Sequence, residues 1–179
     1  SQWGTGSTCR DHSDKAQCAF MKVYRLTRSE YSYDLSGFGA SISGGRWNYP
    51  GEFILYTAQT SSLSILEALV HLNGVTIGIR YNLLVIEVDD SGISDLQMMG
   101  SQLPNDWAEI KNIELTRQIG SQWVKGKISP ILKVPSVLNP LENNYLINSG
   151  HPDLSIEILE KRWYLYDGRL MDKRGFNQP

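Results

Sequence analysis

GGRWNYPGEFILYTAQTSSLSILEALVHL, residues 44–72, is the stretch on which the predicted fold depends. It opens as a glycine-rich loop, and residues 53–56 form an apolar, aromatic run of strand length between a Pro-Gly pair and a polar cluster. Apolar residues at helical spacing follow this run. The stretch therefore predicts a loop, a strand and a helix in succession, which carry Arg46, Tyr56 and Glu67 in that order.

The predicted helix carries a carboxylate on its apolar face. Ser61 and Ser62 can cap its start, because a serine oxygen accepts a backbone N–H of the first turn. Three apolar residues fall on one face at i, i+3 and i+7: Leu63, Leu66 and Val70. The pattern places Glu67 in the middle of that face rather than at its edge. A carboxylate in such a position must be paired or must open into a cleft.

The composition bounds the class of protein. The 179 residues suffice for one domain with a substantial core, and 41% hydrophobic with 20% charged residues is ordinary for a globular protein. The net charge of −2 argues against a broad surface for nucleic acid or anionic membranes, which requires clustered surplus Lys and Arg. No apolar run approaches the roughly 20 residues that span a bilayer. We therefore expect no direct nucleic-acid partner and no membrane partner.

The first twenty residues differ from the rest of the chain. Residues 1–20 are rich in small polar residues, show no periodicity and contain both cysteines, Cys9 and Cys18. We interpret them as a leader or the remnant of an expression tag, and we expect the catalytic domain over residues 21–179. That domain contains no cysteine, which suits a reducing cytosol and predicts a cytoplasmic location.

The remainder of the chain intermixes short strands and helices. Strands are predicted over residues 21–27, 83–88, 131–134, 143–148, 156–159 and 163–166, a helical stretch opens at residues 103–106, and another helix spans residues 114–124. Several glycines predict an irregular loop over residues 35–48. Trp107 and Trp123 are expected in the core. Without an internal repeat or a linker, this pattern predicts a single compact α+β domain.

Five polar residues emerge from apolar surroundings: Arg25, Arg46, Tyr56, Glu67 and Ser136. Two guanidiniums can clamp a pyrophosphate, and a tyrosine ring can stack on a heterocycle. A buried glutamate can hold a ribose hydroxyl and stabilise cationic charge at an anomeric carbon. Taken singly, the arginines, the tyrosine and the serine also fit ordinary roles in a strand edge, a loop, the core or a turn. Together they are the parts needed to break the N-glycosidic bond of a nucleotide.

Histidine offers little further chemistry. His71 follows Glu67 by four residues on the predicted helix, a spacing that can chelate a metal ion, but no other ligand cluster accompanies the pair. Ser136 lies in Val-Pro-Ser-Val, which is not a nucleophile elbow. We expect neither a metal site nor a Ser-His-acid triad.

An ordered series of motifs resembles the RES domain, the toxin half of bacterial RES–Xre toxin–antitoxin systems. The series is GGRWN, LYTA, ILEALVHL, KVPS, ENNYLIN and His-Pro, and the resemblance runs from residue 21 to about residue 167. It departs from the family pattern at residues 148–152. The family usually has an Asn-Pro before the His-Pro pair, whereas this chain has Asn-Ser-Gly-His-Pro. The resemblance implies a split mixed sheet similar to that of ADP-ribosyltransferases, with an NAD-binding cleft.

The resemblance also implies a role for each of the five residues. Arg25 and Arg46 would bind the NAD pyrophosphate, with Tyr56 packed beside the nicotinamide ribose. Ser136 would orient a ribose hydroxyl or the nicotinamide half, and Glu67 would stabilise the oxocarbenium-like transition state. Glu67, Arg46 and Ser136 are thus the expected catalytic residues, and Arg25, Arg46, Tyr56 and Ser136 the expected NAD-binding residues.

The implied function is a toxin that depletes cellular NAD by cleaving the nicotinamide–ribose bond. Water or inorganic phosphate would be the acceptor, and no cofactor beyond NAD as substrate is expected. The implied partner is an Xre-type helix-turn-helix antitoxin that plugs the cleft, and self-association into a homo-oligomer remains open. Two alternatives are a transferase that attaches ADP-ribose to a protein, and a non-catalytic interaction module that keeps the fold.

Overall fold

The computed structural model describes residues 19–71 and 79–167. The strands are β1 (Phe20–Arg28), β2 (Ile54–Ala58), β3 (Tyr81–Asp89), β4 (Ile93–Asp95), β5 (Ile131–Pro135), β6 (Asn143–Asn148) and β7 (Ile156–Tyr164). The α-helices are α1 (Phe38–Ser43), α2 (Ser61–Val70) and α3 (Ile113–Gly126), and 3₁₀ turns cover Ser29–Tyr31 and Ile110–Asn112. Except for its last two residues, the predicted leader lies outside the described residues.

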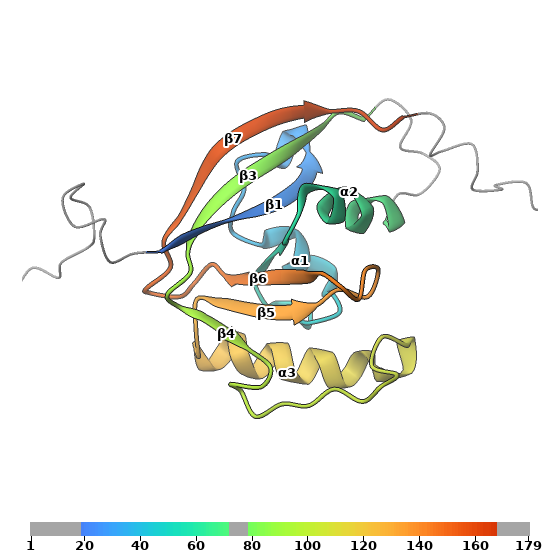
Figure 1. Ribbon diagram of the computed structural model, residues 1–179, viewed down its shortest axis with the longest axis vertical. Coiled ribbons are helices and arrows are strands. Elements are labelled where there is room, and N and C mark those ends of the chain that lie inside the picture. Colours follow the sequence, from blue (N-terminus) through green and yellow to red (C-terminus); the bar gives the residue numbers. More distant parts are fainter. Residues whose placement is uncertain (1–18, 72–78, 168–179) are drawn as a thin grey trace, which may run out of the picture.

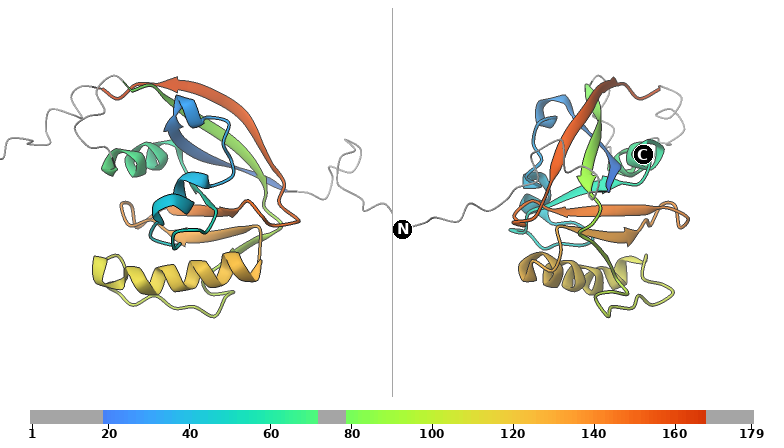
Figure 2. Two further views of the ribbon diagram at one scale, coloured as in Figure 1. Left: turned by 180° about the vertical axis from the view of Figure 1, so that it is seen from behind. Right: turned by 60° about the vertical axis from the view of Figure 1, so that its left-hand side comes forward.

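A single mixed sheet has the strand order β4-β5-β6-β2-β1-β3-β7, with β4 and β5 parallel and the other neighbours antiparallel. Its two halves barely meet, because β1 and β2 share one registered pair, Tyr24 with Ala58. Figure 1 shows β1, β3 and β7 curving away from β4, β5 and β6. In the right-hand view of Figure 2 the strands of the two halves run in clearly different directions. The predicted α+β fold with a split mixed sheet is confirmed.

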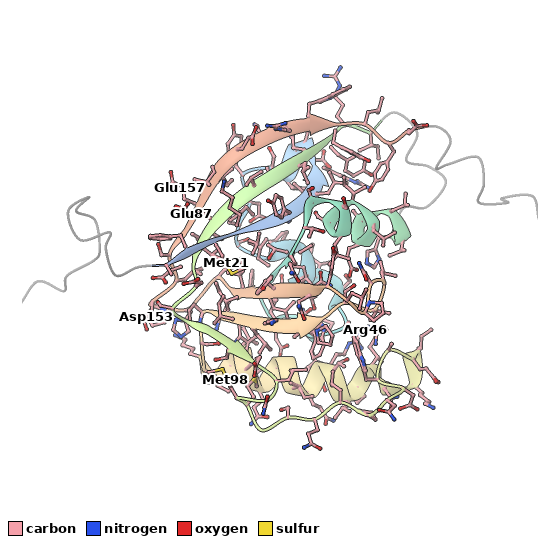
Figure 3. The ribbon with its side chains drawn as sticks, viewed as in Figure 1. Met21, Arg46, Glu87, Met98, Asp153 and Glu157 are labelled. Carbon is pink, nitrogen blue, oxygen red and sulfur yellow. The ribbon has the colours of Figure 1, made fainter. Side chains whose placement is uncertain are left out.

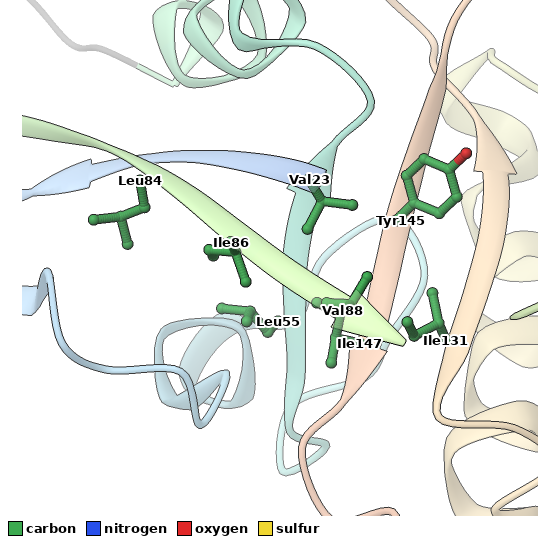
Figure 4. Packing of buried hydrophobic residues seen from close by; sticks show 8 residues of the cluster. All are labelled: Val23, Leu55, Leu84, Ile86, Val88, Ile131, Tyr145 and Ile147. Atoms are coloured by element: carbon green, nitrogen blue, oxygen red, sulfur yellow. The ribbon is translucent and has the colours of Figure 1, made fainter. Parts of the chain in front are cut away.

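Period-two alternation along the strands builds two cores on opposite faces of β5 and β6. Tyr145 and Ile147 of β6 join the cluster that lies between the two halves of the sheet, shown in Figure 4, whereas Leu146 faces the other way. Leu146 packs with Trp123, which is fully buried on α3. Trp107 packs partly buried against the same cluster. The prediction that both tryptophans belong to the core is therefore confirmed.

Helix α3 lies so close to the Arg46 loop that one helix position must be glycine. A Cβ on Gly120 would stand 1.9 Å from the carbonyl oxygen of Trp47 and 2.8 Å from its carbonyl carbon. The Thr116 hydroxyl donates to the Arg46 carbonyl at 2.7 Å, and Arg117 Nε donates to the Gly45 carbonyl at 2.8 Å. Helix α3 therefore fixes the backbone of this loop.

Helix α2 differs from its predicted form in two respects. Its N-cap is Thr60, whose hydroxyl accepts the Leu63 N–H at 3.1 Å, rather than one of the two serines. Leu66 and Val70 are 38% and 52% exposed, so the predicted apolar face is not buried as a unit. The helix instead packs on β1 and β3 through the adjoining face: Ile65, Ala68 and Leu69. Glu67 thus lies at the margin of the buried face, where the helix borders open space.

Four further elements differ from the sequence prediction. The loop over residues 35–48 contains α1, and β4 was not predicted. The helical stretch around Trp107 is a series of turns followed by the 3₁₀ turn Ile110–Asn112. The two predicted C-terminal strands are one strand, β7, whose pairing with β3 shifts between Val85 and Ile86. Across residues 19–71 and 79–167, no helix combines the length and the apolarity needed to cross a membrane.

A buried carboxylate ties α3 to the end of the same loop. Glu52 is 7% exposed and accepts hydrogen bonds from the Ser121 hydroxyl at 2.5 Å, from the Tyr49 N–H at 2.9 Å and from Lys125 Nζ at 2.9 Å. Burial raises the pKa of Glu52, but these donors outweigh burial and hold its pKa below the ordinary value of 4.5. The ionised form is therefore the one that the fold stabilises.

We expect Glu52→Gln to lower the free energy of unfolding at pH 7 by about 1.5–3 kcal/mol, because hydrogen bonds to a charged acceptor are lost. A carboxyl whose pKa is depressed in the folded state contributes stability above its unfolded-state pKa and loses it as the pH falls through the folded-state pKa. The difference between wild type and variant should therefore shrink as the pH falls below 4.5. Urea unfolding at a series of pH values measures it, with Glu157→Gln on the exposed edge of β7 as control. A pH-independent difference would contradict this role.

Candidate active site

Three adjoining hollows open where the two halves of the sheet diverge. The inner hollow, about 220 Å³, lies between β1 and β2 under α2, and its lining includes Arg25, Glu67 and Asn144. The Arg46 hollow, about 510 Å³, is lined by Arg46 and again by Glu67 and Asn144. The outer hollow, about 730 Å³, is lined by Arg25 and by residues of β1, α1 and β3. Tyr56 and His71 border all three, so the hollows form one continuous cleft.

Glu67 stands at the junction of the inner hollow and the Arg46 hollow. Its Oε1 accepts hydrogen bonds from the Ser136 hydroxyl at 2.9 Å and from Asn144 Nδ2 at 2.7 Å. Ser136 and Asn144 come from the C-terminal end of β5 and the start of β6, residues about 70 positions further along the chain. One carboxylate oxygen is thus fixed by two donors, and the carboxylate borders both hollows. Such a group can meet positive charge that develops on a bound molecule.

Ser136 is placed behind Glu67 rather than in the cleft. It is 1% exposed and does not line any of the three hollows. Its hydroxyl donates to Glu67 and accepts the N–H groups of Leu138 at 3.0 Å and Asn139 at 3.1 Å. The sequence predicted a direct contact between Ser136 and the ribose or the nicotinamide, whereas the Ser136 hydroxyl here faces Glu67 and not the cleft. Ser136 can act through Glu67, whose orientation it fixes.

Arg46 reaches the cleft from the glycine-rich loop, and Figure 3 shows it at the end of the sheet between α2 and α3. Its Nη1 donates to the Trp107 carbonyl at 3.3 Å and its Nη2 to the Ala108 carbonyl at 3.0 Å. Its guanidinium carbon lies 5.8 Å from the centre of the Trp107 ring. Burial lowers the pKa of Arg46, and the negative charge of Glu67 opposes that shift. The two charged groups therefore interact across the Arg46 hollow.

Arg25 lines the inner and outer hollows from β1. Its Nη1 donates to the main-chain carbonyl of Asp34 at 2.5 Å. Burial lowers the pKa of Arg25, and the Asp34 carboxylate partly offsets that effect. A half-buried guanidinium in a concave wall has donors left to bind an anion. A solvent-exposed arginine on a strand edge would bind the same anion less well.

Tyr56 lines the cleft, and its hydroxyl holds the loop that carries Arg46. The hydroxyl donates to Asn48 Oδ1 at 2.8 Å and accepts the Trp47 N–H at 3.0 Å, and so it secures the Gly-Arg-Trp-Asn loop. Asn48 is fully buried, and its Nδ2 donates to the carbonyls of Ala40, Tyr49 and Glu52. Burial raises the pKa of the Tyr56 hydroxyl, which therefore remains a neutral donor. The ring remains available to the cleft.

The fold thus brings Arg25, Arg46, Tyr56 and Glu67 to one cleft and places Ser136 behind Glu67. Sequence reasoning missed Asn144 as a site residue, since an asparagine near the start of a strand has no distinctive pattern. Its Oδ1 is buried and has no hydrogen-bond partner among the described residues, which is costly and calls for an explanation. The hydrogen bond from its Nδ2 to Glu67 Oε1 fixes the amide in the orientation that leaves this oxygen unpaired. Sequence reasoning also treated His71 solely as a metal-ligand candidate, whereas it borders all three hollows.

Two further points from the sequence are the loop at residues 148–152 and the possibility of a metal site. The loop at residues 148–152, where the chain departs from the family pattern, lies at the opposite end of β6 from Asn144, because Asn148 pairs with Ile54 and Asn144 with Ala58. Figure 3 shows Asp153, just beyond this loop, at the other end of the sheet from Arg46. Among the residues that the structure describes, no group of three or more His, Cys, Asp or Glu side chains could hold a metal ion.

Comparison with known proteins gives concordant results. A model of the RES domain family matches residues 22–167. The "Prs ADP-ribosylating toxin" of Sphingobium sp. (strain YBL2) is 37% identical over 157 residues, covering 87% of this chain and 98% of that protein. A "Toxin Res" of Photorhabdus laumondii is 39% identical, covering 84% of this chain and 97% of that protein. A "Toxin Res" of Yersinia enterocolitica is 34% identical, with coverages of 84% and 99%.

The fold also has a counterpart among solved structures. A chain of the M. tuberculosis MbcT–MbcA toxin–antitoxin complex superimposes with a TM-score of 0.65 at 21% identity, covering 82% of this chain and 85% of that one. This likeness concerns the fold. Because the family model spans most of the chain and the relatives exceed 30% identity over nearly their whole length, the chain belongs to the RES domain family and is a RES toxin.

Proposed function

We propose that this protein is an enzyme that cleaves the nicotinamide–ribose bond of NAD and thereby depletes the cell of NAD. The observation that carries the proposal is the Glu67 carboxylate, with one oxygen held by Ser136 and Asn144, at the junction of two hollows that contain Arg25 and Arg46. The arginines supply donors for the pyrophosphate, and the carboxylate supplies negative charge where the ribose becomes cationic. Tyr56 borders both hollows.

The order of events follows from these positions. NAD binds with its pyrophosphate against the guanidiniums and its nicotinamide ribose beside Glu67. As the bond from the anomeric carbon to the nicotinamide nitrogen breaks, positive charge spreads over that carbon and the ring oxygen, and the Glu67 carboxylate stabilises it. A small nucleophile then bonds to the anomeric carbon: water releases ADP-ribose and a proton, and inorganic phosphate yields ADP-ribose 1″-phosphate. Either acceptor fits an open cleft.

The decisive experiment incubates the purified protein with NAD in the presence and absence of phosphate and identifies the ribose-containing product. Release of nicotinamide with free ADP-ribose supports hydrolysis, and a phosphorylated product formed with phosphate supports phosphorolysis. Failure of the wild-type protein to release nicotinamide under either condition would overturn the proposal and favour a non-catalytic interaction module.

A second candidate function is transfer of ADP-ribose to a protein. It is favoured by the 37% identity to the Sphingobium protein whose name is "Prs ADP-ribosylating toxin". The same cleft would serve, with a protein side chain as the nucleophile. NAD labelled in its adenylate half separates the two functions, because transfer leaves the label on protein and hydrolysis leaves it on a small molecule.

We further propose that an antitoxin protein, of the Xre helix-turn-helix type implied by the family resemblance, inhibits the enzyme by occupying this cleft. The structural likeness to a chain of a toxin–antitoxin complex supports an antitoxin partner. Exposed apolar residues at the mouth of the Arg46 hollow give it a surface to contact: Val70 and Val137. Addition of such a partner should abolish nicotinamide release.

We expect Asn144→Ala to lower kcat for NAD by about 10- to 100-fold, because Glu67 loses a hydrogen bond donated by a neutral amide to its charged oxygen. Asn144→Asp should lower kcat at least as much, because it places a second carboxylate beside Glu67. The matched control is Asn143→Ala, one residue earlier on β6 and outside the three hollows. Steady-state kinetics distinguish them, and equal effects at both positions would refute the role of Asn144.

A further inference from the structure

Arg46 and Glu67 carry opposite charges and line the same hollow, yet they do not pair. The negative charge of Glu67 reaches Arg46, but no salt bridge joins them in the part of the chain that the structure describes. Two opposite charges in a partly desolvated hollow attract each other strongly. An explanation is therefore needed for what holds the guanidinium away from the carboxylate.

The restraint comes from a turn that the sequence did not distinguish. The carbonyls of Trp107 and Ala108 accept hydrogen bonds from Nη1 and Nη2 of Arg46, at 3.3 and 3.0 Å. The indole ring of Trp107 lies 5.8 Å from the guanidinium carbon and 6.0 Å from the ring of Trp47. The guanidinium thus contacts two carbonyl dipoles and an aromatic face, which attract a cation without neutralising it.

Contacts within residues 104–112 secure this turn. The Trp107 N–H donates to the Pro104 carbonyl at 3.0 Å, and Asn112 Nδ2 donates to the Asp106 carbonyl at 2.8 Å. Lys111 Nζ lies 2.6 Å from Asp106 Oδ2 and 3.2 Å from Glu109 Oε2. The turn is therefore a preformed element, and Trp107 is the member whose side chain reaches both the core and Arg46.

We propose that Trp107 is a positioning residue that aims the Arg46 guanidinium into the cleft and keeps it from closing onto Glu67. Without this restraint the two groups would form an ion pair, which would occupy the forked donors that an anionic substrate needs and the carboxylate that the reacting ribose needs. The inference rests on the proposed function, in that the substrate carries a pyrophosphate.

We expect Trp107→Leu to lower kcat/KM for NAD by about 10-fold, because the guanidinium loses the aromatic face above it and the turn that presents the two carbonyls loses its packing against Trp47. Trp107→Phe should recover most of the loss, because it keeps an aromatic face toward the guanidinium. Trp163→Leu, a matched change at a 65% exposed tryptophan on β7, should leave the kinetics unchanged. Equal losses in the leucine and phenylalanine variants would overturn the proposal.

A double-mutant cycle separates positioning from general damage to the fold. Trp107→Leu should cost nothing further in an Arg46→Ala background, because the residue that it aims is absent. Additive losses in an active enzyme would overturn this inference and leave the proposed function intact. Absence of NAD cleavage by the wild type would instead overturn the proposed function.

A readout independent of activity tests the restraint itself. In the ¹⁵N NMR spectrum, the Nη–H signals of Arg46, assigned by their loss in Arg46→Lys, should be resolved in the wild type because the carbonyls hinder rotation of the guanidinium. They should average in Trp107→Leu, because the turn that presents these carbonyls is no longer secured by the packing of the indole against Trp47. Signals that remain resolved in the variant would show that Trp107 does not hold Arg46, whatever the substrate.

Discussion

Glu67→Gln is expected to lower kcat for NAD cleavage by about 10²- to 10³-fold or more, with a much smaller change in KM. Glutamine has nearly the same shape and can still reach Ser136, so the loss reports the negative charge rather than the space that the side chain fills. That charge acts mainly on the transition state, in which the ribose is cationic. It acts less on bound NAD, whose positive charge lies on the nicotinamide ring rather than on the ribose beside Glu67. The loss should therefore appear in kcat.

The measurement is steady-state release of nicotinamide, accompanied by thermal unfolding to verify that the fold is retained. Glu87→Gln is the matched control, because Figure 3 shows Glu87 on β3 far from Arg46. The kcat and the Tm of Glu87→Gln should match those of the wild type. If Glu67→Gln retained wild-type kcat, Glu67 would have no part in the chemistry, and the proposed mechanism would fail.

Gly120→Ala is expected to destabilise the protein by at least ~3 kcal/mol, and so to lower Tm by about 6–12 °C for a chain of this size. The added Cβ would stand 1.9 Å from the Trp47 carbonyl oxygen, which belongs to the backbone and cannot rotate aside. Either α3 must move away from the Arg46 loop or the loop must move, and both changes disturb the buried packing of Trp123 and Ile119.

The control for this variant is Gly126→Ala, at the end of the same helix. The Cβ there would lie 3.3 Å from Cγ1 of Ile128, a flexible side chain that can adjust, so stability should change by less than about 1 kcal/mol. Thermal and urea unfolding measure both variants. A Gly120→Ala protein as stable as wild type would mean that the close approach of α3 and the loop is easily relaxed.

Much of the fold could be predicted from local patterns. The apolar runs identify β2, β3, β5 and β6 as strands, and successive side chains of a strand point to opposite faces, so that Tyr145 and Ile147 face one core and Leu146 the other. The helix predicted over residues 114–124 is confirmed as α3, where Leu115, Ile119 and Trp123 recur at helical spacing and pack into one core. The prediction of α2 identified the element but not its buried face, since Leu66 and Val70 have the hydrophobicity of core residues and the border of a cleft leaves them exposed.

Most residues of the candidate site, but not Asn144, could be predicted from the sequence, whereas the contacts between them could not. The family motifs named Arg25, Arg46, Tyr56, Glu67 and Ser136, and the fold brings the first four to the cleft and places Ser136 behind Glu67. The contacts that define what each does join residues far apart in the chain: Ser136 to Glu67, Asn144 to Glu67, and Arg46 to the turn at Trp107. Hydrogen bonds of this kind leave no periodicity in the sequence.

The sequence by itself determined most of the side chains that this protein brings to the candidate site and most of the strands and helices that carry them, because hydrophobic period and motif order are local properties of the chain. The tertiary structure alone decided that Ser136 is buried behind Glu67, that Asn144 joins it there, and that two carbonyls and an indole hold Arg46 apart from the carboxylate. The physical reason is that a cleft exists only where the two halves of the sheet diverge. The directions of Arg46 and Glu67 there are set by partners 60 to 80 residues away.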